Sequence, residues 1–224
     1  MKNSYFIIVI ITILFNVALI GQSRYLPSGQ SGLRIGGGVS GNEDATAFSG
    51  GVSVSIGGYV DLGLGYGSIS FDEKLGGADL TATTLSPYIG IEIVKQSEEL
   101  PIDIRAAGGY YTAQYSNSYL SNLAIEMSGS GWEVGGSISS AFSVTESIKI
   151  MPVFGITYGE ATMKLEDNLG NEIKSDDNTT YFDIDLVISV KTGKSHYLNV
   201  SPWIRFYEEK HTIGVDFSYV LGFQ

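Results

Sequence analysis

Apolar residues alternate with small or polar ones through most of this chain. Positions 213, 215, 217, 219, 221 and 223 hold Ile, Val, Phe, Tyr, Leu and Phe, with Gly, Asp, Ser, Val and Gly between them. The same period of two runs from Phe48 to Ile56 and from Phe182 to Val190. Successive residues of a β-strand point to opposite sides of the sheet, so each segment has one apolar and one polar face. The pattern predicts an all-β fold.

Ten such segments follow one another along the chain. They cover residues 33–40, 46–56, 59–71, 79–94, 101–115, 123–143, 147–164, 179–192, 196–208 and 211–223. Short connections, such as 57–58, 145–146 and 193–194, alternate with longer polar ones at 41–45, 72–78, 116–122 and 165–178. The short connection at 209–210 is the exception. Strands of even number with this asymmetry are typical of an antiparallel, up-and-down transmembrane β-barrel. We expect about ten strands, with eight or twelve as alternatives.

The composition of the polar faces indicates what surrounds the barrel. They consist mostly of Gly, Ser, Thr, Ala and Tyr, and only 17% of the chain is charged. A soluble surface usually has a larger charged fraction, of about 25–35%. We therefore expect the apolar face to meet lipid and the polar face to line the lumen. A secreted soluble β-barrel or β-sandwich binding protein is the alternative.

Twelve charged residues of both signs fall on the polar faces and are expected to form a network in the lumen. They are Arg34, Asp61, Glu92, Asp103, Arg105, Glu133, Lys149, Asp183, Asp185, Lys191, Arg205 and Asp216. Bulky inward candidates are Tyr88, Tyr111, Tyr181, Trp203 and Tyr207. Because side chains just fill a barrel of about eight strands, ten strands enclose little more space. We expect a plugged or very narrow lumen.

The start of the chain has the pattern of a secretory signal peptide. Lys2 precedes an apolar stretch from Tyr5 to Ile20, and the small or polar residues Gly21 and Gln22 follow. The stretch is shorter than the roughly 20 residues of a membrane-spanning helix, and an uncleaved anchor is the alternative. We expect a signal peptide at 1–22, a short periplasmic segment at 23–32 and the barrel at 33–224, with both chain ends in the periplasm.

The last segment resembles the terminal strand that outer-membrane barrels present to their assembly machinery. It alternates Val215, Phe217, Tyr219, Leu221 and Phe223, and only Gln224 follows. With the signal peptide and the alternating strands, the chain resembles the small porin-like β-barrel proteins of Gram-negative outer membranes. The resemblance implies an outer-membrane location and contact with outer-membrane lipids and the barrel-assembly machinery. It implies no catalytic residue, and we expect a monomer.

Aromatic residues gather toward both ends of the predicted span, as in the girdles that mark membrane interfaces. The outer set is Tyr66, Tyr110, Tyr111, Trp132 and Tyr158, and the periplasmic set is Tyr59, Phe142 and Phe223. Three prolines, Pro87, Pro152 and Pro202, fall on the apolar face inside strands, where each removes a hydrogen-bond donor. We expect β-bulges at a common height to absorb them.

Little in the sequence points to catalysis or to a cofactor. The chain has no Cys, which excludes a thiolate nucleophile and a cysteine zinc site, and its net charge of −11 argues against a nucleic-acid-binding surface. No helix follows the glycines at 36–38, so we expect them to serve packing and not phosphate binding. Of the two histidines, His196 is expected in a periplasmic turn. His211, near Glu208, is the one candidate base.

The sequence therefore predicts a non-enzymatic outer-membrane barrel without cofactor or metal site. Its acidic outer loops would serve a structural, adhesive or surface-binding role, with a ligand that the sequence does not identify. The segment 166–178 holds five carboxylates and one Lys. We expect a solvated loop there, with a loose divalent-cation site as the alternative. The other functional alternatives are a small-solute pore and an integral hydrolase that uses His211 on lipid or peptide.

Overall fold

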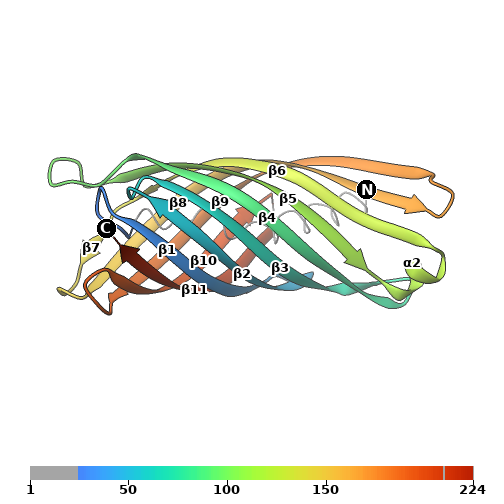
Figure 1. The fold of residues 1–224 in the computed structure, drawn as a ribbon. Coiled ribbons are helices and arrows are strands. Elements are labelled where there is room, and N and C mark those ends of the chain that lie inside the picture. Colours follow the sequence, from blue (N-terminus) through green and yellow to red (C-terminus); the bar gives the residue numbers. More distant parts are fainter. Residues whose placement is uncertain (1–24, 209, 224) are drawn as a thin grey trace.

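Ten long antiparallel strands close into a barrel in the computed structural model, which describes residues 25–208 and 210–223 (Figure 1). The strands are β1 (Ser31–Gly41), β2 (Ala45–Ile56), β3 (Val60–Leu75), β4 (Ala78–Val94), β5 (Asp103–Ser116), β6 (Ile125–Ser139), β8 (Ile148–Asp167), β9 (Glu172–Lys191), β10 (His196–Tyr207) and β11 (Lys210–Phe223). The two-residue β7 (Phe142–Ser143) continues β6, and α2 (Ser118–Asn122) connects β5 to β6. Pairing of β1 with β11 and of β6 with β8 closes the barrel. The predicted ten-stranded antiparallel fold is confirmed.

Both ends of the described chain lie at one end of the barrel, here called the terminal end. Its connections are 57–59, 95–102, 144–147 and 192–195, and the opposite end, the far end, carries 42–44, 76–77, 117–124 and 168–171. The expected asymmetry of short and long loops is therefore wrong. Most of 72–78 and 165–178 is strand, and the β8–β9 ladder continues to Glu166 and Glu172. Alternation of polarity reports burial, so it fades where both faces of a hairpin are in water although the backbone stays extended.

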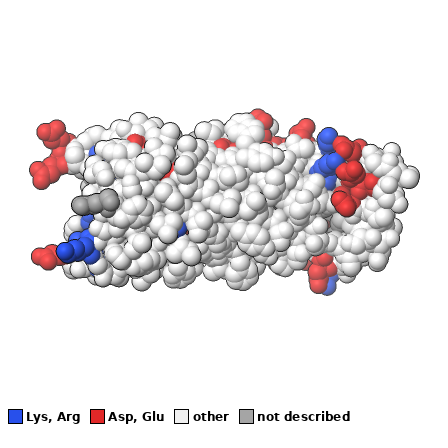
Figure 2. Space-filling view, in the orientation of Figure 1, with Lys and Arg blue, Asp and Glu red and all other residues white. Residues whose placement is uncertain are grey.

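The outward face of the central barrel is apolar. Ile35, Phe48 and Phe154 are 59%, 63% and 58% exposed and lie on strands from both halves of the chain. Figure 2 shows a wall that is almost free of charge between two charged ends. A continuous apolar band of this kind belongs in hydrocarbon, and it matches the lipid-facing band of transmembrane barrels. The barrel spans a membrane with its strands. In the described part of the chain, no helix is long and apolar enough to cross one.

Exposed aromatic side chains border this band on both sides. Tyr66, Tyr110, Trp132 and Tyr158 lie on the far-end side, where the ring centroids of Trp132 and Tyr158 are 5.7 Å apart. Tyr59, Phe142 and Phe223 are exposed on the terminal side. Tyr111 does not belong to the outer girdle. It faces the lumen and is 2% exposed, because its neighbour Tyr110 takes the outward position of β5.

Past the outer girdle the two faces of the strands exchange character. On β3, Ile69 and Phe71 are buried inside the barrel, whereas Ser68 and Ser70 are exposed outside it. The buried set comprises Ala45, Ala47, Ile69, Phe71, Leu80, Ala82, Tyr111, Ala113 and Ala161, with Tyr115 and Met163 packed against it. An apolar interior with a polar exterior is the arrangement of a soluble β-barrel. We call this cluster the extramembrane core, and it shows that the far part of the barrel stands outside the lipid.

The three strand prolines interrupt the ladder without the bulges that we expected. On one side the pairs Pro87–Leu64, Pro152–Leu186 and Pro202–Val215 are intact. In an antiparallel strand the N–H and C=O of one residue point to the same neighbour. The backbone nitrogen of each proline, which carries no hydrogen, faces the strand on its other side. On that side the ladder is interrupted, at 86–87, 140–141 and 201–202, and it then resumes in the same register. The register shifts lie elsewhere, at 71–75 and 92–94.

Several inward glycines leave room for a large side chain on the neighbouring strand. Gly63 pairs with Tyr88, Gly131 with Tyr111 and Gly214 with Trp203, and a Cβ at any of these glycines would overlap the partner ring. Gly38 likewise accommodates the carboxylate of Asp216, in agreement with the packing role expected for the glycines at 36–38. The glycine content of the chain thus allows a narrow barrel to hold bulky side chains.

Candidate functional site

A short segment before β1 packs inside the terminal end of the barrel. Tyr25 and Leu26 are buried there in a cluster with Met151, Val153, Val187, Tyr197 and Val220. The Nε2 of Gln30 donates to the Ser195 hydroxyl at 2.7 Å, and the Gly29 N–H donates to the Gly57 carbonyl at 2.8 Å. Sequence reasoning missed this cluster, because a lone Leu in a polar segment carries no periodicity. The segment forms an apolar terminal layer.

The first group of lumen charges is centred on Arg105 of β5. Its guanidinium forms an ion pair with Asp61 of β3 and lies 3.9 Å from Glu92 of β4. The space that it fills is left by Gly90, where a Cβ would overlap the guanidinium. Asp103 accepts a hydrogen bond from the backbone N–H of Gln96 at 2.7 Å. One guanidinium thus links carboxylates of two neighbouring strands, β3 and β4.

A second group is centred on Arg205 of β10. Its Nε donates to Asp183 of β9 at 2.6 Å, and its guanidinium carbon lies 3.7 Å from the ring centroid of Tyr181. The Tyr181 hydroxyl donates in turn to Glu133 of β6. A guanidinium over an aromatic face gains cation–π attraction, which increases when the pair is desolvated. The chain of contacts runs along the inner wall from β10 through β9 to β6.

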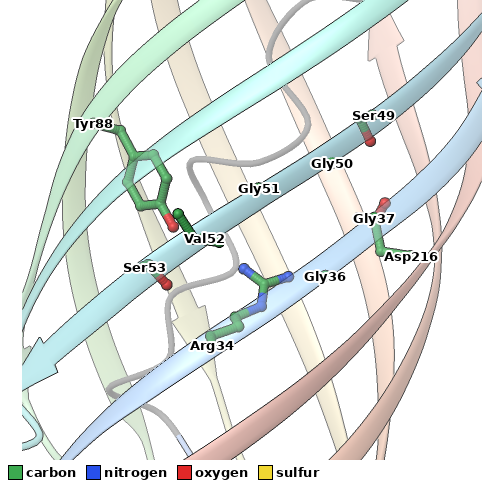
Figure 3. Close-up of a pocket in the computed structure, with 10 residues that line it drawn as sticks. All are labelled: Arg34, Gly36, Gly37, Ser49, Gly50, Gly51, Val52, Ser53, Tyr88 and Asp216. Carbon is green, nitrogen blue, oxygen red and sulfur yellow. The ribbon is translucent and has the colours of Figure 1, made fainter.

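Arg34 and Asp216 face a small cavity between these groups (Figure 3). Tyr88, Ser53 and the glycines of β1 and β2 complete its lining. Only about 10 Å³ is open to the centre of a water molecule, which is room for roughly one water. The cavity interrupts the packing of the lumen but does not form a passage.

Ten of the twelve charged residues predicted for the lumen are at most 9% exposed: Arg34, Asp61, Glu92, Asp103, Arg105, Glu133, Asp183, Asp185, Arg205 and Asp216. The bulky side chains of Tyr88, Tyr111, Tyr181, Trp203 and Tyr207 are buried with them. Lys149 and Lys191 do not join this set. They take inward positions on β8 and β9, but each lies at the terminal end of its strand, where water reaches it. Buried side chains thus lie in three successive layers along the lumen: the terminal layer, a charged middle layer and the extramembrane core.

The far rim of the barrel is uneven. Hairpin β10–β11 turns after Tyr207 and hairpin β1–β2 after Gly41, whereas hairpin β8–β9 projects well beyond both (Figure 1). Pairing of β9 with β10 ends at Phe182 and Phe206, although pairing of β9 with β8 continues to Glu172. Among the described residues, no strand pairs with the other edge of β9 over 172–178. We call this segment the free edge of β9.

A groove of about 460 Å³ crosses the outer surface of β5, β6, β8 and β9 beside this edge. Tyr110 and Trp132 line the groove on the barrel side, and Glu160, Asp176 and Asp177 bring carboxylates to it. Asp176 accepts a hydrogen bond from Thr162 at 2.7 Å, and Glu160 accepts one from the Tyr158 hydroxyl at 2.8 Å. This outer groove combines aromatic rings with negative charge just above the girdle.

The tip of hairpin β8–β9 is held by a network of ion pairs. Lys164 lies 2.6 Å from Glu166 and 2.5 Å from Glu172, and Lys174 lies 2.9 Å from the second Glu172 oxygen. Hydrogen bonds from the two lysines lower the pKa of Glu172 to about 2. The carboxylates of the predicted acidic loop are thus engaged within a hairpin. In residues 25–208 and 210–223, no group of three or more His, Cys, Asp or Glu side chains is placed to hold a metal ion.

The two histidines lie at opposite ends of the barrel. His211 is exposed on β11 opposite Phe206, in an open groove that Glu43 and Lys210 also line. His196 opens β10, and its Nδ1 lies 2.5 Å from the Tyr219 hydroxyl. It therefore belongs to a strand and not to a solvated turn. The C-terminal alternation of Val215, Phe217, Tyr219, Leu221 and Phe223 forms the outward face of β11, and its role in assembly stays a prediction.

Comparison with known proteins gives a structural likeness only. No protein-family model matches the sequence, and no curated protein matches it. The translocator domain of autotransporter NalP from Neisseria meningitidis has a TM-score of 0.56 at 11% identity, with 99% of this chain and 96% of that chain covered. The transport unit of autotransporter AIDA-I from Escherichia coli has a TM-score of 0.52 at 9% identity, with 99% and 98% covered.

The attachment invasion locus protein Ail of Yersinia pestis reaches a TM-score of 0.43 at 11% identity, over 88% of this chain and all of that chain. At such identities the likeness shows the fold alone. The fold and the apolar exterior are those of an outer-membrane β-barrel, and the predicted outer-membrane location follows from them.

Proposed function

We propose that this protein is a closed, non-conducting outer-membrane barrel that holds a folded platform above the lipid for binding at the cell surface. The observation that carries the proposal is the filling of the lumen by three successive layers of buried side chains. A pore requires a continuous aqueous path, whereas a display scaffold requires only a rigid wall and exposed segments beyond it. The platform is the far part of the barrel, with its own apolar core.

Absence of conduction is tested directly in planar lipid bilayers. The refolded protein is expected to give no discrete conductance steps, and proteoliposomes that contain it are expected not to swell in small sugars. A general diffusion porin, refolded and inserted in the same way, is the positive control. Stable conductance steps in the parent protein would refute the closed-barrel function.

The proposal places the far end outside the cell. Because the chain has no Cys, a single cysteine can report its orientation. Leu169→Cys lies at an 82% exposed position of the far end, and Glu146→Cys is its matched control in an exposed turn of the terminal end. A membrane-impermeant maleimide added to intact cells should label the first variant and not the second. The reverse result would mean that the platform faces the periplasm.

The proposed role is non-enzymatic. Hydrolysis needs a nucleophile or activated water, a base and an orienting group within hydrogen-bond reach. His211, the candidate base, lies exposed on the outward face of a strand opposite the apolar Phe206. This position favours a non-catalytic role. Lipid and peptide hydrolysis in detergent should be absent in the parent protein. Activity that is lost in His211→Ala but kept in His196→Ala would identify an enzyme.

A further inference from the structure

We propose that the free edge of β9 binds an extended, basic segment of another protein by strand addition. This inference names the partner class for the platform, and it rests on the proposed function for the location of that edge outside the lipid. A strand added to an exposed sheet edge gains affinity from main-chain hydrogen bonds and specificity from its alternating side chains.

The direction of the backbone groups of β9 follows from its register. The Lys191 N–H donates to the Ser147 carbonyl on the β8 side at 2.7 Å, and the Thr192 N–H donates to the His196 carbonyl on the β10 side at 2.9 Å. The β8–β9 register is unbroken as far as Glu172. Odd-numbered residues of β9 therefore direct their N–H and C=O to β8, and even-numbered residues direct theirs to the β10 side.

The free edge consequently presents the backbone groups of Glu172, Lys174 and Asp176 to solvent. The next even residue, Asn178, donates its N–H to the Asp177 carboxylate at 2.8 Å, which caps the edge near the membrane. Three residues at an even spacing offer alternating donors and acceptors to one incoming strand. Natural proteins commonly protect such edges with Lys or Pro, and in 172–178 only Lys174 has that character.

The charge of this region selects a basic partner. Glu172 is already paired with Lys164 and Lys174, so the negative charge left beside the edge is that of Asp176 and Asp177, and the outer groove adds Glu160. Basic side chains on the outward face of an added strand would meet Asp176 and Glu160 in charge-assisted contacts. On the opposite face, Ile173 is 70% exposed and offers an apolar contact. An extended segment that alternates basic and apolar residues fits both faces. Edge-to-edge pairing of two copies would instead bring like charges together.

The test uses the full chain refolded in lipid nanodiscs and a fluorescent nine-residue peptide that alternates Lys with Val. A peptide in which Pro replaces each Val keeps the charge and is disfavoured as a strand. Lys174→Pro removes one outward-directed N–H and, by the register, spares the β8 ladder. Lys174→Ala is the matched control, with the same loss of charge and the N–H retained. We expect binding of the Lys–Val peptide at least tenfold weaker in Lys174→Pro than in Lys174→Ala, as judged by fluorescence anisotropy.

Equal affinity of the two variants, or equal binding of the two peptides, would show that binding depends on charge alone and not on strand pairing. Either result would overturn the proposal. Hydrogen exchange on the parent protein needs no variant. The amides of Glu172, Lys174 and Asp176 should become protected when the Lys–Val peptide binds, and unchanged exchange would also overturn it. A parent protein that is dimeric without peptide and monomeric as Lys174→Pro would assign the edge to a second copy instead. A conducting barrel that still binds the peptide would refute the proposed function and leave this inference standing.

Discussion

Arg205 covers the ring of Tyr181, with its guanidinium carbon 3.7 Å from the ring centroid. The same guanidinium is bound by Asp183, and the Tyr181 hydroxyl is bound to Glu133. Each group therefore contacts the next in a buried part of the lumen. The charge of Asp183 is compensated there by Arg205, so removal of either partner should leave an uncompensated buried charge.

Replacement of Arg205 by Met should leave Asp183 buried without its partner. Removal of one member of a buried ion pair costs about 3–5 kcal/mol, and we expect a loss of that size in the free energy of unfolding. Reversible urea unfolding in lipid vesicles measures it. The double variant Arg205→Met with Asp183→Leu should recover much of the loss, because neither charge then remains. A single variant as stable as the parent would contradict the network described above.

Gly131 should not tolerate even a methyl group. A Cβ there would collide with the Glu160 carbonyl and with the ring of Tyr111, and overpacking of this kind costs about 1–3 kcal/mol. Gly50→Ala is the matched control, since its Cβ would have the Gly36 carbonyl as its nearest contact, at 3.8 Å. Urea midpoints of the two variants give the comparison. Equal midpoints would mean that the wall moves to accommodate the methyl group.

The outward face of β3 changes from apolar to polar along the strand, so a lysine substitution should have different effects on stability at its two ends. Leu62 and Ser70 both point outward on this strand, on either side of the Tyr66 girdle position. Leu62→Lys should destabilise the barrel by about 2–4 kcal/mol, the cost of a lysine facing lipid near the midplane. Ser70→Lys should stay within about 0.5 kcal/mol of the parent, as at an ordinary wet surface. A large penalty at Ser70 would move the lipid boundary outward.

The tip of hairpin β8–β9 should loosen in acid. The folded pKa of Glu172, about 2, lies below its value in the unfolded chain, which is about 4.3. Its contribution to order in the hairpin is therefore complete above pH 4.3 and is lost as the pH falls toward 2. The amide protection factors of 164–174, which correct for the slower intrinsic exchange in acid, should fall between pH 6 and pH 3 in the parent and change less in Glu172→Gln. High salt should weaken the effect, because these pairs are exposed.

The sequence was sufficient for the strands because lipid imposes one rule on every span. A residue such as Phe48 must face outward and its neighbour Ser49 inward, and this rule predicted ten strands. Their ends lie within four residues of the predicted ones, except that β9 begins at Glu172, seven residues before its predicted start. Ten of the twelve charged residues that parity assigned to the lumen are buried, whereas Lys149 and Lys191 are exposed at the ends of their strands. Parity gives the direction of a side chain but not its depth along the barrel axis.

Features that depend on contacts distant in sequence could not be predicted in this way. The packing of Leu26 against Val187 and Val220 has no counterpart in local periodicity. Tyr111 was assigned to two places because an aromatic residue suits both a girdle and a core. The length of hairpin β8–β9 was hidden because its polar residues satisfy water on both faces. The free edge of β9 could be seen only by comparing the ladders of its two neighbours.

The terminal layer should also affect the rate at which the barrel unfolds. Closure pairs Ser31 with Phe223, residues from opposite ends of the described chain, and contacts of such long range are the slowest to form. Leu26 packs beside Gly222, and Gln30 binds Ser195, so the segment before β1 lies across the β1–β11 seam. We therefore expect this segment to detach before β1 and β11 separate, so that the rate at which it detaches limits how long the barrel stays folded.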